Sequence, residues 1–180
     1  MDTPHTPSHE FSAPWGRQLT LLTGLCGLIL FGISGTMLAQ APESPPLLYQ
    51  VGIWLCPVIF LLGALFAVRG YRLEGDSLVV LRPGWSTRLS LQGIKSAAFQ
   101  PEATKGSIRI FGNGGLFGFI GLFRNQTLGR YRAFATDFSR TVVLQLPAQT
   151  IVVTPDDPAR FVAQVNATFD LAGSAPTARP

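Results

Sequence analysis

The chain has 180 residues, a formal net charge of +4, and hydrophobic side chains at almost half of its positions. Its two cysteines, Cys26 and Cys56, lie in long uncharged stretches, and its two histidines, His5 and His9, lie close to the N-terminus. The chain beyond residue 70 therefore has no histidine base, no thiol nucleophile and no usual set of zinc ligands. This composition argues against the common enzyme and zinc-site chemistries, so we expect no catalytic residue, no cofactor and no metal.

The two ends of the chain are expected to be disordered tails. Residues 1–17 are rich in proline, serine and threonine, a composition that buries too little apolar surface to order a segment. Residues 171–180 are similarly poor in large apolar side chains, and we expect the same of them.

Two uncharged stretches, 19–39 and 47–68, dominate the first third of the chain. Each is a little over twenty residues long, enough for a helix to cross the roughly 30 Å hydrocarbon core of a bilayer. A short proline-rich turn at 42–46 separates them, so we expect a two-helix transmembrane hairpin over residues 18–69. A signal peptide cleaved near Ala41 is an alternative, but the first apolar stretch is long and its N-terminal flank is hardly basic.

The positive charges near the apolar stretches indicate which way the hairpin faces. The turn contains Glu43 and no basic residue, whereas Arg69 and Arg72 follow the second stretch and Arg17 precedes the first. Basic flanks stay on the cytoplasmic side. We therefore expect both termini and the soluble domain to lie in the cytoplasm.

Small residues spaced four apart occur in both apolar stretches. Such pairs let two helices approach closely, and here they begin at Gly32, Gly35 and Gly63. We expect these glycines to be helix-packing positions, used within the hairpin, with a partner protein or in a homo-oligomer. No ionisable residue lies inside either stretch, which argues against an ion pathway.

Residues 70–170 are expected to form one mainly-β domain closed by a helix. Short runs such as 87–91, 107–111 and 130–134 alternate polar and apolar residues, as half-buried strands do. About seven antiparallel strands fit the pattern. Asp156 and Asp157 then precede Pro158, a typical helix start, and Val162, Val165 and Phe169 form an apolar stripe behind it.

The segments 107–121, 128–136 and 154–161, together with the preceding apolar helices, resemble the bacterial pleckstrin-homology (PH)-like domain membrane proteins. The resemblance covers about residues 70–170. It implies a PH-like fold, a curved sheet of about seven strands with a C-terminal helix, that serves as a binding scaffold without catalysis.

The glycine-rich segment 112–123 leaves two interpretations open. It lacks the lysine of a phosphate-binding loop and the third glycine of a dinucleotide fingerprint, so we expect no nucleotide there. It is either a β-hairpin whose glycines supply positive φ angles, or a loop that inserts Leu116, Phe117 and Phe119 into the membrane interface.

Basic residues are concentrated between residues 105 and 140, where six of them accompany a single acidic residue. A basic surface beside the membrane attracts anionic lipid, although such charges can also simply keep strand edges soluble. The candidate contact residues for a lipid or partner are Arg109, Arg124, Arg130 and Arg132. No nucleic-acid module accompanies them, so we expect no nucleic-acid partner.

These observations favour a non-catalytic binding or scaffold module, anchored at the inner face of a bacterial membrane, that recognises a protein, a peptide or an anionic lipid headgroup. The alternative is an accessory subunit of a larger membrane complex, recognised through its transmembrane helices.

Overall fold

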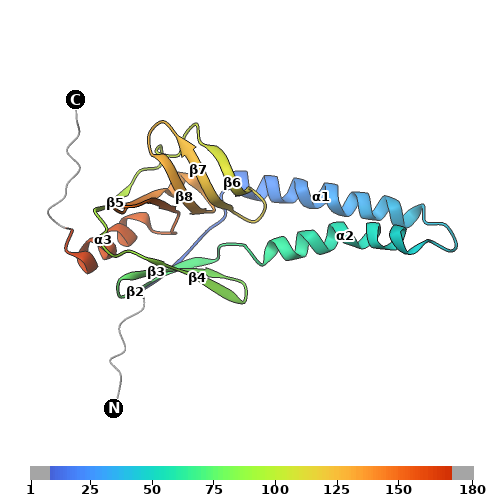
Figure 1. The fold of residues 1–180 in the computed structure, drawn as a ribbon, viewed down its shortest axis with the longest axis horizontal. Coiled ribbons are helices and arrows are strands. Elements are labelled where there is room, and N and C mark those ends of the chain that lie inside the picture. The colour runs from blue at the N-terminus through green and yellow to red at the C-terminus, as the bar shows by residue number, and fades with distance from the viewer. Residues whose placement is uncertain (1–8, 172–180) are drawn as a thin grey trace, which may run out of the picture.

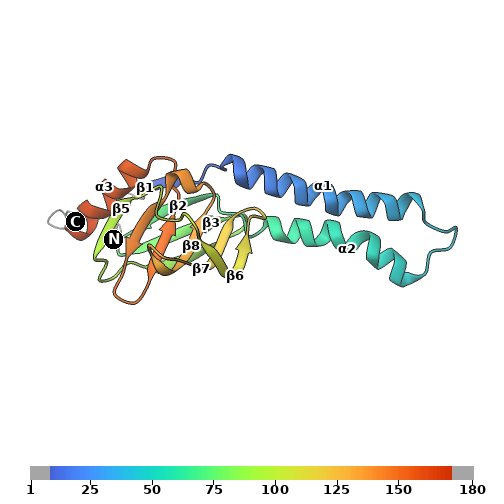
Figure 2. The ribbon, with the colours of Figure 1, turned by 90° about the horizontal axis from the view of Figure 1, so that it is seen from above.

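The computed structural model describes residues 9–171. Two antiparallel helices, α1 (Arg17–Ala39) and α2 (Leu47–Ala64), project together from one end of a mainly-β domain (Figures 1 and 2). Both are long and apolar enough to cross a membrane, and only 17% and 6% of their most apolar windows are buried. Such low burial distinguishes them from the core helix of a soluble protein.

The two helices pack on each other through glycines other than those predicted. A Cβ atom on Gly27 would lie 3.2 Å from the Phe60 ring, and one on Gly52 would lie 3.0 Å from the Met37 methyl group. By contrast, Gly32 and Gly35 have no neighbouring atom within 4 Å of such a position. Gly32 and Gly35 therefore have no close neighbour within the hairpin, and their role in helix packing, within the hairpin or against another chain, stays a prediction.

The β domain contains two sheets, one above the other in Figure 1. The four-stranded sheet has the order β1 (His9–Ser12), β2 (Gly70–Glu74), β3 (Ser77–Arg82), β4 (Trp85–Ser90). The six-stranded sheet has the order β5 (Ser96–Phe99), β9 (Val142–Gln145), β10 (Thr150–Val153), β8 (Gly129–Ala135), β7 (Phe119–Asn125), β6 (Ile108–Gly114). A short 3₁₀ helix, η1 (Phe138–Arg140), precedes β9.

The predicted mainly-β architecture is confirmed, with differences in strand number and direction. The described residues form ten strands where about seven were expected. Strands β8 and β10 pair in parallel, while every other pair is antiparallel. The chain between β8 and β10 passes through η1 and β9, which gives it enough length to return in the same direction.

Strand β1 corrects the prediction of a wholly disordered N-terminal tail. It pairs with β2, and its Phe11 side chain is buried against Phe161, with ring centroids 5.0 Å apart. The reason is tertiary: a single apolar side chain in a polar segment becomes ordered where a long-range partner covers it. The domain is thus assembled from chain on both sides of the helical hairpin. Residues 1–8 and 172–180 of the predicted tails lie outside the described residues.

Helix α3 (Pro158–Phe169) closes the domain as predicted. The Asp157 carboxylate accepts a hydrogen bond from the Arg160 backbone N–H at 3.0 Å, which caps the helix start. Phe161 and Val165 lie on the buried face of this helix, in the core between the two sheets. Val165 belongs to the apolar stripe that the sequence predicted, and the other two members of that stripe, Val162 and Phe169, are partly buried against the same core.

The six-stranded sheet is buried on both faces at its centre. Leu144 and Ile151 point into the core between the sheets, whereas Val143 and Val152 join a second cluster on the opposite face. Leu19 from the start of α1 packs into that second cluster. Burial on both faces explains why β9 and β10 are continuous apolar runs without alternation.

Candidate functional site

The glycine-rich segment forms the β6–β7 hairpin, so the hairpin interpretation is confirmed. Gly112 and Gly121 are register partners, with φ angles of +107° and +137°. A Cβ atom on Gly121 would lie 2.9 Å from the Gly112 Cα atom, so side chains cannot fit between the two backbones. The register also shifts between Arg109 and Phe111, a bulge that bends the hairpin.

The tip of this hairpin packs on the helices. The Phe117 ring lies 4.8 Å from the Phe60 ring of α2, and the Phe117 backbone N–H donates to the Thr23 hydroxyl of α1 at 3.1 Å. That hydroxyl in turn donates to the Gly115 carbonyl at 3.2 Å. Leu116 contacts Gly63, where a Cβ atom would lie 3.3 Å from a Leu116 methyl group. Gly63 therefore packs against the hairpin tip.

The third apolar candidate of this segment lies elsewhere. Phe119 is buried on the face of the six-stranded sheet that carries Tyr131 and Ala135, and its ring packs against Phe138. The segment thus divides its large side chains between the helices and the core.

A second hairpin, β3–β4, holds the end of α2 from the other sheet. The Trp85 indole N–H donates to the Leu65 carbonyl at 2.8 Å, and the Arg82 guanidinium donates to the Phe66 carbonyl at 2.6 Å. Carbonyls at a helix C-terminus lack partners within the helix, so these two side chains satisfy groups that would otherwise be exposed. The helices and the domain are therefore joined at two hairpins, one from each sheet.

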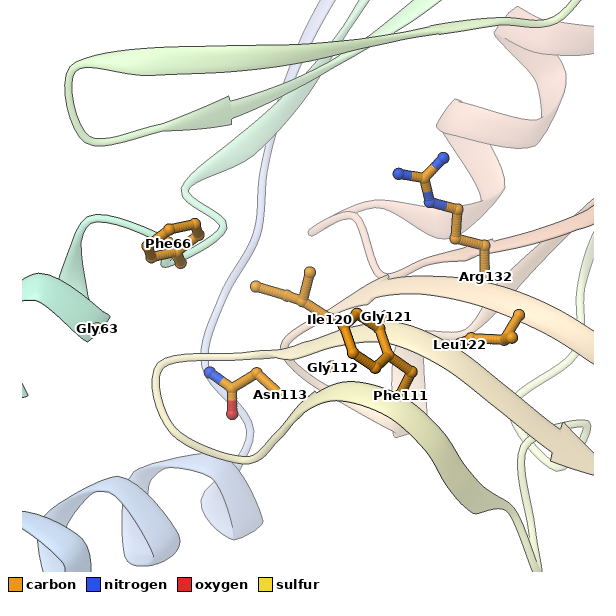
Figure 3. Close-up of a pocket in the computed structure, with 9 residues that line it drawn as sticks. All are labelled: Gly63, Phe66, Phe111, Gly112, Asn113, Ile120, Gly121, Leu122 and Arg132. Carbon is orange, nitrogen blue, oxygen red and sulfur yellow. The ribbon is translucent and has the colours of Figure 1, made fainter.

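A groove of about 480 Å³ lies between the end of α2 and the six-stranded sheet (Figure 3). Phe66 lies on one side of this groove, and Ile120 and Leu122 lie on the other. The complete lining is Gly63, Phe66, Phe111, Gly112, Asn113, Ile120, Gly121, Leu122 and Arg132. The lining is mostly apolar, and it begins at the last turn of α2.

Three of the four predicted arginines share the face of the six-stranded sheet that lines this groove. Arg124 and Arg130 are register partners on β7 and β8, and Arg132 faces the same way two residues further along β8. All three are exposed. We call the uncovered part of this sheet the open face, and its residues are Ile108, Phe111, Leu122, Arg124, Arg130 and Arg132.

Arg109 does not belong to the open face. It is the register partner of Phe123, which points to the opposite side of the sheet, and its guanidinium lies beside Gly114 there. Neighbouring strands fix which face a residue occupies, so the sequence alone could not separate Arg109 from the others.

Arg82 is a residue of this region that the sequence did not single out. It follows the buried Leu78 and Val80 along one face of β3, and only 7% of its surface is exposed. Its guanidinium lies 5.8 Å from the Phe134 ring, and that of Arg132 lies 5.1 Å from the same ring. The alternation of Leu78, Val80 and Arg82 was the available signal, since it places an arginine at a core position.

The environment of Arg82 is unusual for a charged group. Burial lowers the pKa of the Arg82 guanidinium, and the nearby charge of Arg132 lowers it further. Its Nε atom is buried without a hydrogen-bond partner. Among residues 9–171, neither Arg82 nor Arg132 forms an ion pair with a carboxylate.

Comparison with known proteins agrees with the fold. Residues 69–168 match a family model described as "Bacterial PH domain". No curated protein and no solved structure matches the chain. The matched segment begins at β2 and ends in α3, so it covers the β domain apart from β1. The match spans more than half of the chain, and the protein therefore belongs to the bacterial PH domain family.

Proposed function

We propose that this protein is a membrane-anchored, non-catalytic binding module that recognises an anionic group at the inner face of a bacterial membrane. The observation that carries this proposal is the open face, on which Arg124, Arg130 and Arg132 lie together without an ion-paired carboxylate among the described residues. Basic side chains near an anionic membrane surface contribute on the order of 1 kcal/mol each.

Membrane anchoring in this orientation has two supports. β1 precedes α1 and β2 follows α2, and the two strands pair in one sheet, so both ends of the helical hairpin lie on the domain's side. Arg69 and Arg72 follow α2 directly, which favours the cytoplasm for that side. Cleavage after Ala41 would remove a paired strand from the domain, and we therefore propose that both helices are retained.

The experiment is a lipid competition on the full-length protein in detergent. We expect native mass spectrometry, with equimolar phosphatidylglycerol and phosphatidylcholine, to show more bound phosphatidylglycerol. The double variant Arg124→Gln/Arg130→Gln should reduce this preference. The matched control, Arg109→Gln/Arg160→Gln, removes the same charge from other surfaces and should keep it. Equal binding of the two lipids by the wild-type protein would contradict the proposal.

A second candidate, an accessory subunit of a membrane complex, is favoured by a different observation. No neighbouring atom lies within 4 Å of the position that a Cβ would occupy on Gly32 or Gly35. This leaves a smooth helix surface for another helix. The two functions are compatible, since they use opposite ends of the molecule.

A further inference from the structure

Two arginines, one from each sheet, lie close to the Phe134 ring. Arg82 continues the inward face of β3, and Arg132 continues the inward face of β8, next to Phe134. Figure 3 shows the Arg132 side chain leaving its strand on the same side as Ile120 and Leu122. Both guanidinium groups lie within 6 Å of the Phe134 ring centroid.

Among the described residues, neither Arg82 nor Arg132 has an ion-paired carboxylate, and the buried Arg82 lacks its full set of hydrogen-bond acceptors. A buried charge is ordinarily matched by an opposite charge, and a buried N–H by an acceptor. Arg82 is 93% buried, donates to one carbonyl, stacks near Trp85 at 4.5 Å, and leaves its Nε without an acceptor. The positive charge of the nearby Arg132 guanidinium repels that of Arg82. An anion with several acceptor oxygens would satisfy both groups, since guanidinium groups bind phosphate through paired hydrogen bonds.

The groove next to Arg132 indicates that the ligand has an apolar part in addition to its anionic group. Its walls are apolar side chains, Phe66, Ile120 and Leu122 among them, and a volume of about 480 Å³ falls in the range of small-ligand sites. The groove begins at Gly63 in the last turn of α2, so it is continuous with the surface of an apolar helix. A ligand that uses both parts has an anionic head and an apolar tail and arrives from the membrane.

We propose that Arg82 and Arg132 bind the phosphate of an anionic phospholipid whose acyl chain lies in the groove between Phe66 and the open face. This inference rests on the proposed function and names the ligand class and its site. Arg124 and Arg130 lie farther along the same face, where they attract anionic lipid without enclosing its phosphate.

Trp85 provides a local reporter, because its ring lies against Arg82 and packs on Phe66 with centroids 5.5 Å apart. The chain has two other tryptophans, so the double substitution Trp15→Phe/Trp54→Phe leaves Trp85 as the only emitter. The full-length protein in detergent is titrated with dihexanoyl phosphatidylglycerol, dihexanoyl phosphatidylcholine or inorganic phosphate. We expect a saturable change in Trp85 emission at the lowest concentration with phosphatidylglycerol.

The variants separate the site from general charge attraction. Arg132→Gln should raise the half-saturating phosphatidylglycerol concentration about tenfold or more, the loss expected for a charge-assisted hydrogen bond. Arg109→Gln, on the opposite face, should leave it unchanged. Arg82→Gln should abolish the response, but Arg82 also holds the end of α2, so the exposed Arg132 is the decisive position.

Three results would overturn the inference: equal half-saturation for phosphatidylglycerol and phosphatidylcholine, equal potency of inorganic phosphate, or no effect of Arg132→Gln. The lipid competition by native mass spectrometry shows whether only the phosphate site is wrong or the proposed function is wrong as well. If phosphatidylglycerol is still preferred there through Arg124 and Arg130, the binding module stands and only this site is wrong. If the wild-type protein shows no preference, both are wrong.

Discussion

The Phe117 ring at the tip of the β6–β7 hairpin packs edge-on against the Phe60 ring of α2, with 4.8 Å between the centroids. This contact joins the β domain to the apolar helices. The position of the groove relative to the helices therefore depends on it.

Removing the Phe117 ring should loosen the domain from the helices. We expect Phe117→Ala to lower the free energy of unfolding by about 3 kcal/mol, the usual cost of deleting a buried aromatic ring. Thermal unfolding of the detergent-solubilised protein measures this. Phe111→Ala is the control, because Phe111 belongs to the same hairpin but is 79% exposed. Equal effects of the two substitutions would contradict the docking role.

The paired glycines of the same hairpin should tolerate no side chain. Gly121→Ala adds a Cβ atom at a φ of +137° against the facing backbone, and we expect a cost of roughly 2–4 kcal/mol. Gly84→Ala, at a φ of +80° in open space, should cost about 1 kcal/mol. If the two variants have the same melting temperature, close backbone contact is not what requires Gly121.

Strand β1 should contribute to the stability of a domain that begins almost sixty residues later. We expect Phe11→Ala to lower the free energy of unfolding by about 3 kcal/mol, because the ring is buried against Phe161. Ser12→Ala, at the exposed neighbouring position, should change it by less than about 0.5 kcal/mol. Circular dichroism on heating compares them; an unaffected Phe11→Ala protein would mean that β1 is dispensable.

Tyr71 should make the stability depend on alkaline pH. Burial raises the pKa of Tyr71 to about 12 from an ordinary value of 10.0, so folding favours the neutral phenol. The contribution of the neutral phenol to the free energy of unfolding is complete below pH 10. It is lost as the pH rises through 12, by on the order of 3 kcal/mol. Tyr71→Phe should remove this component of the pH dependence. If the free energy of unfolding falls equally steeply between pH 10 and 12 in the wild-type protein and in Tyr71→Phe, Tyr71 is not the group responsible.

Tyr71→Phe should also destabilise the protein at neutral pH. The Tyr71 hydroxyl donates to the Phe134 carbonyl at 2.5 Å and accepts from the Thr154 N–H at 3.1 Å. Both backbone groups are buried and would lose this partner, at a cost of about 1–3 kcal/mol. The same unfolding experiment at pH 7 checks this value.

The outward glycines of α1 test the accessory-subunit candidate. Gly32→Leu/Gly35→Leu should leave the melting temperature of the isolated chain unchanged, because neither position contacts α2. In membranes extracted with mild detergent, blue-native electrophoresis should show loss of a larger complex if these glycines pack against another chain. Gly24→Leu, another position without close neighbours, is the control. A complex that survives the double substitution would exclude this surface.

Features encoded locally were predictable from the sequence. The apolar helices, the glycine-rich hairpin and the Asp157 cap of α3 each depend on residues within a few positions of one another. Uniform apolarity, glycine clusters and an Asp–Pro pair are direct signals of these structures.

Features that depend on register and long-range pairing were not predictable in the same way. β1 is ordered by partners far along the chain, and Arg109 is separated from Arg124 by strand register alone. Arg82 and Arg132 come from different sheets, and only the packing of those sheets brings both guanidinium groups within 6 Å of the Phe134 ring centroid. The alternation of Leu78, Val80 and Arg82 indicates a core position for Arg82, but local composition does not identify the long-range partners in any of these arrangements.

The central claim is that a membrane phospholipid binds in the groove between Phe66 and the open face, and photo-crosslinking tests it most directly. The full-length protein is reconstituted in nanodiscs with a phosphatidylglycerol that carries a photoreactive group near its headgroup, and the labelled peptides are mapped. We expect labelling of the 108–132 segment that exceeds labelling by a matched phosphatidylcholine probe. Labelling confined to residues 17–64, or equal labelling of 108–132 by both probes, would contradict the account.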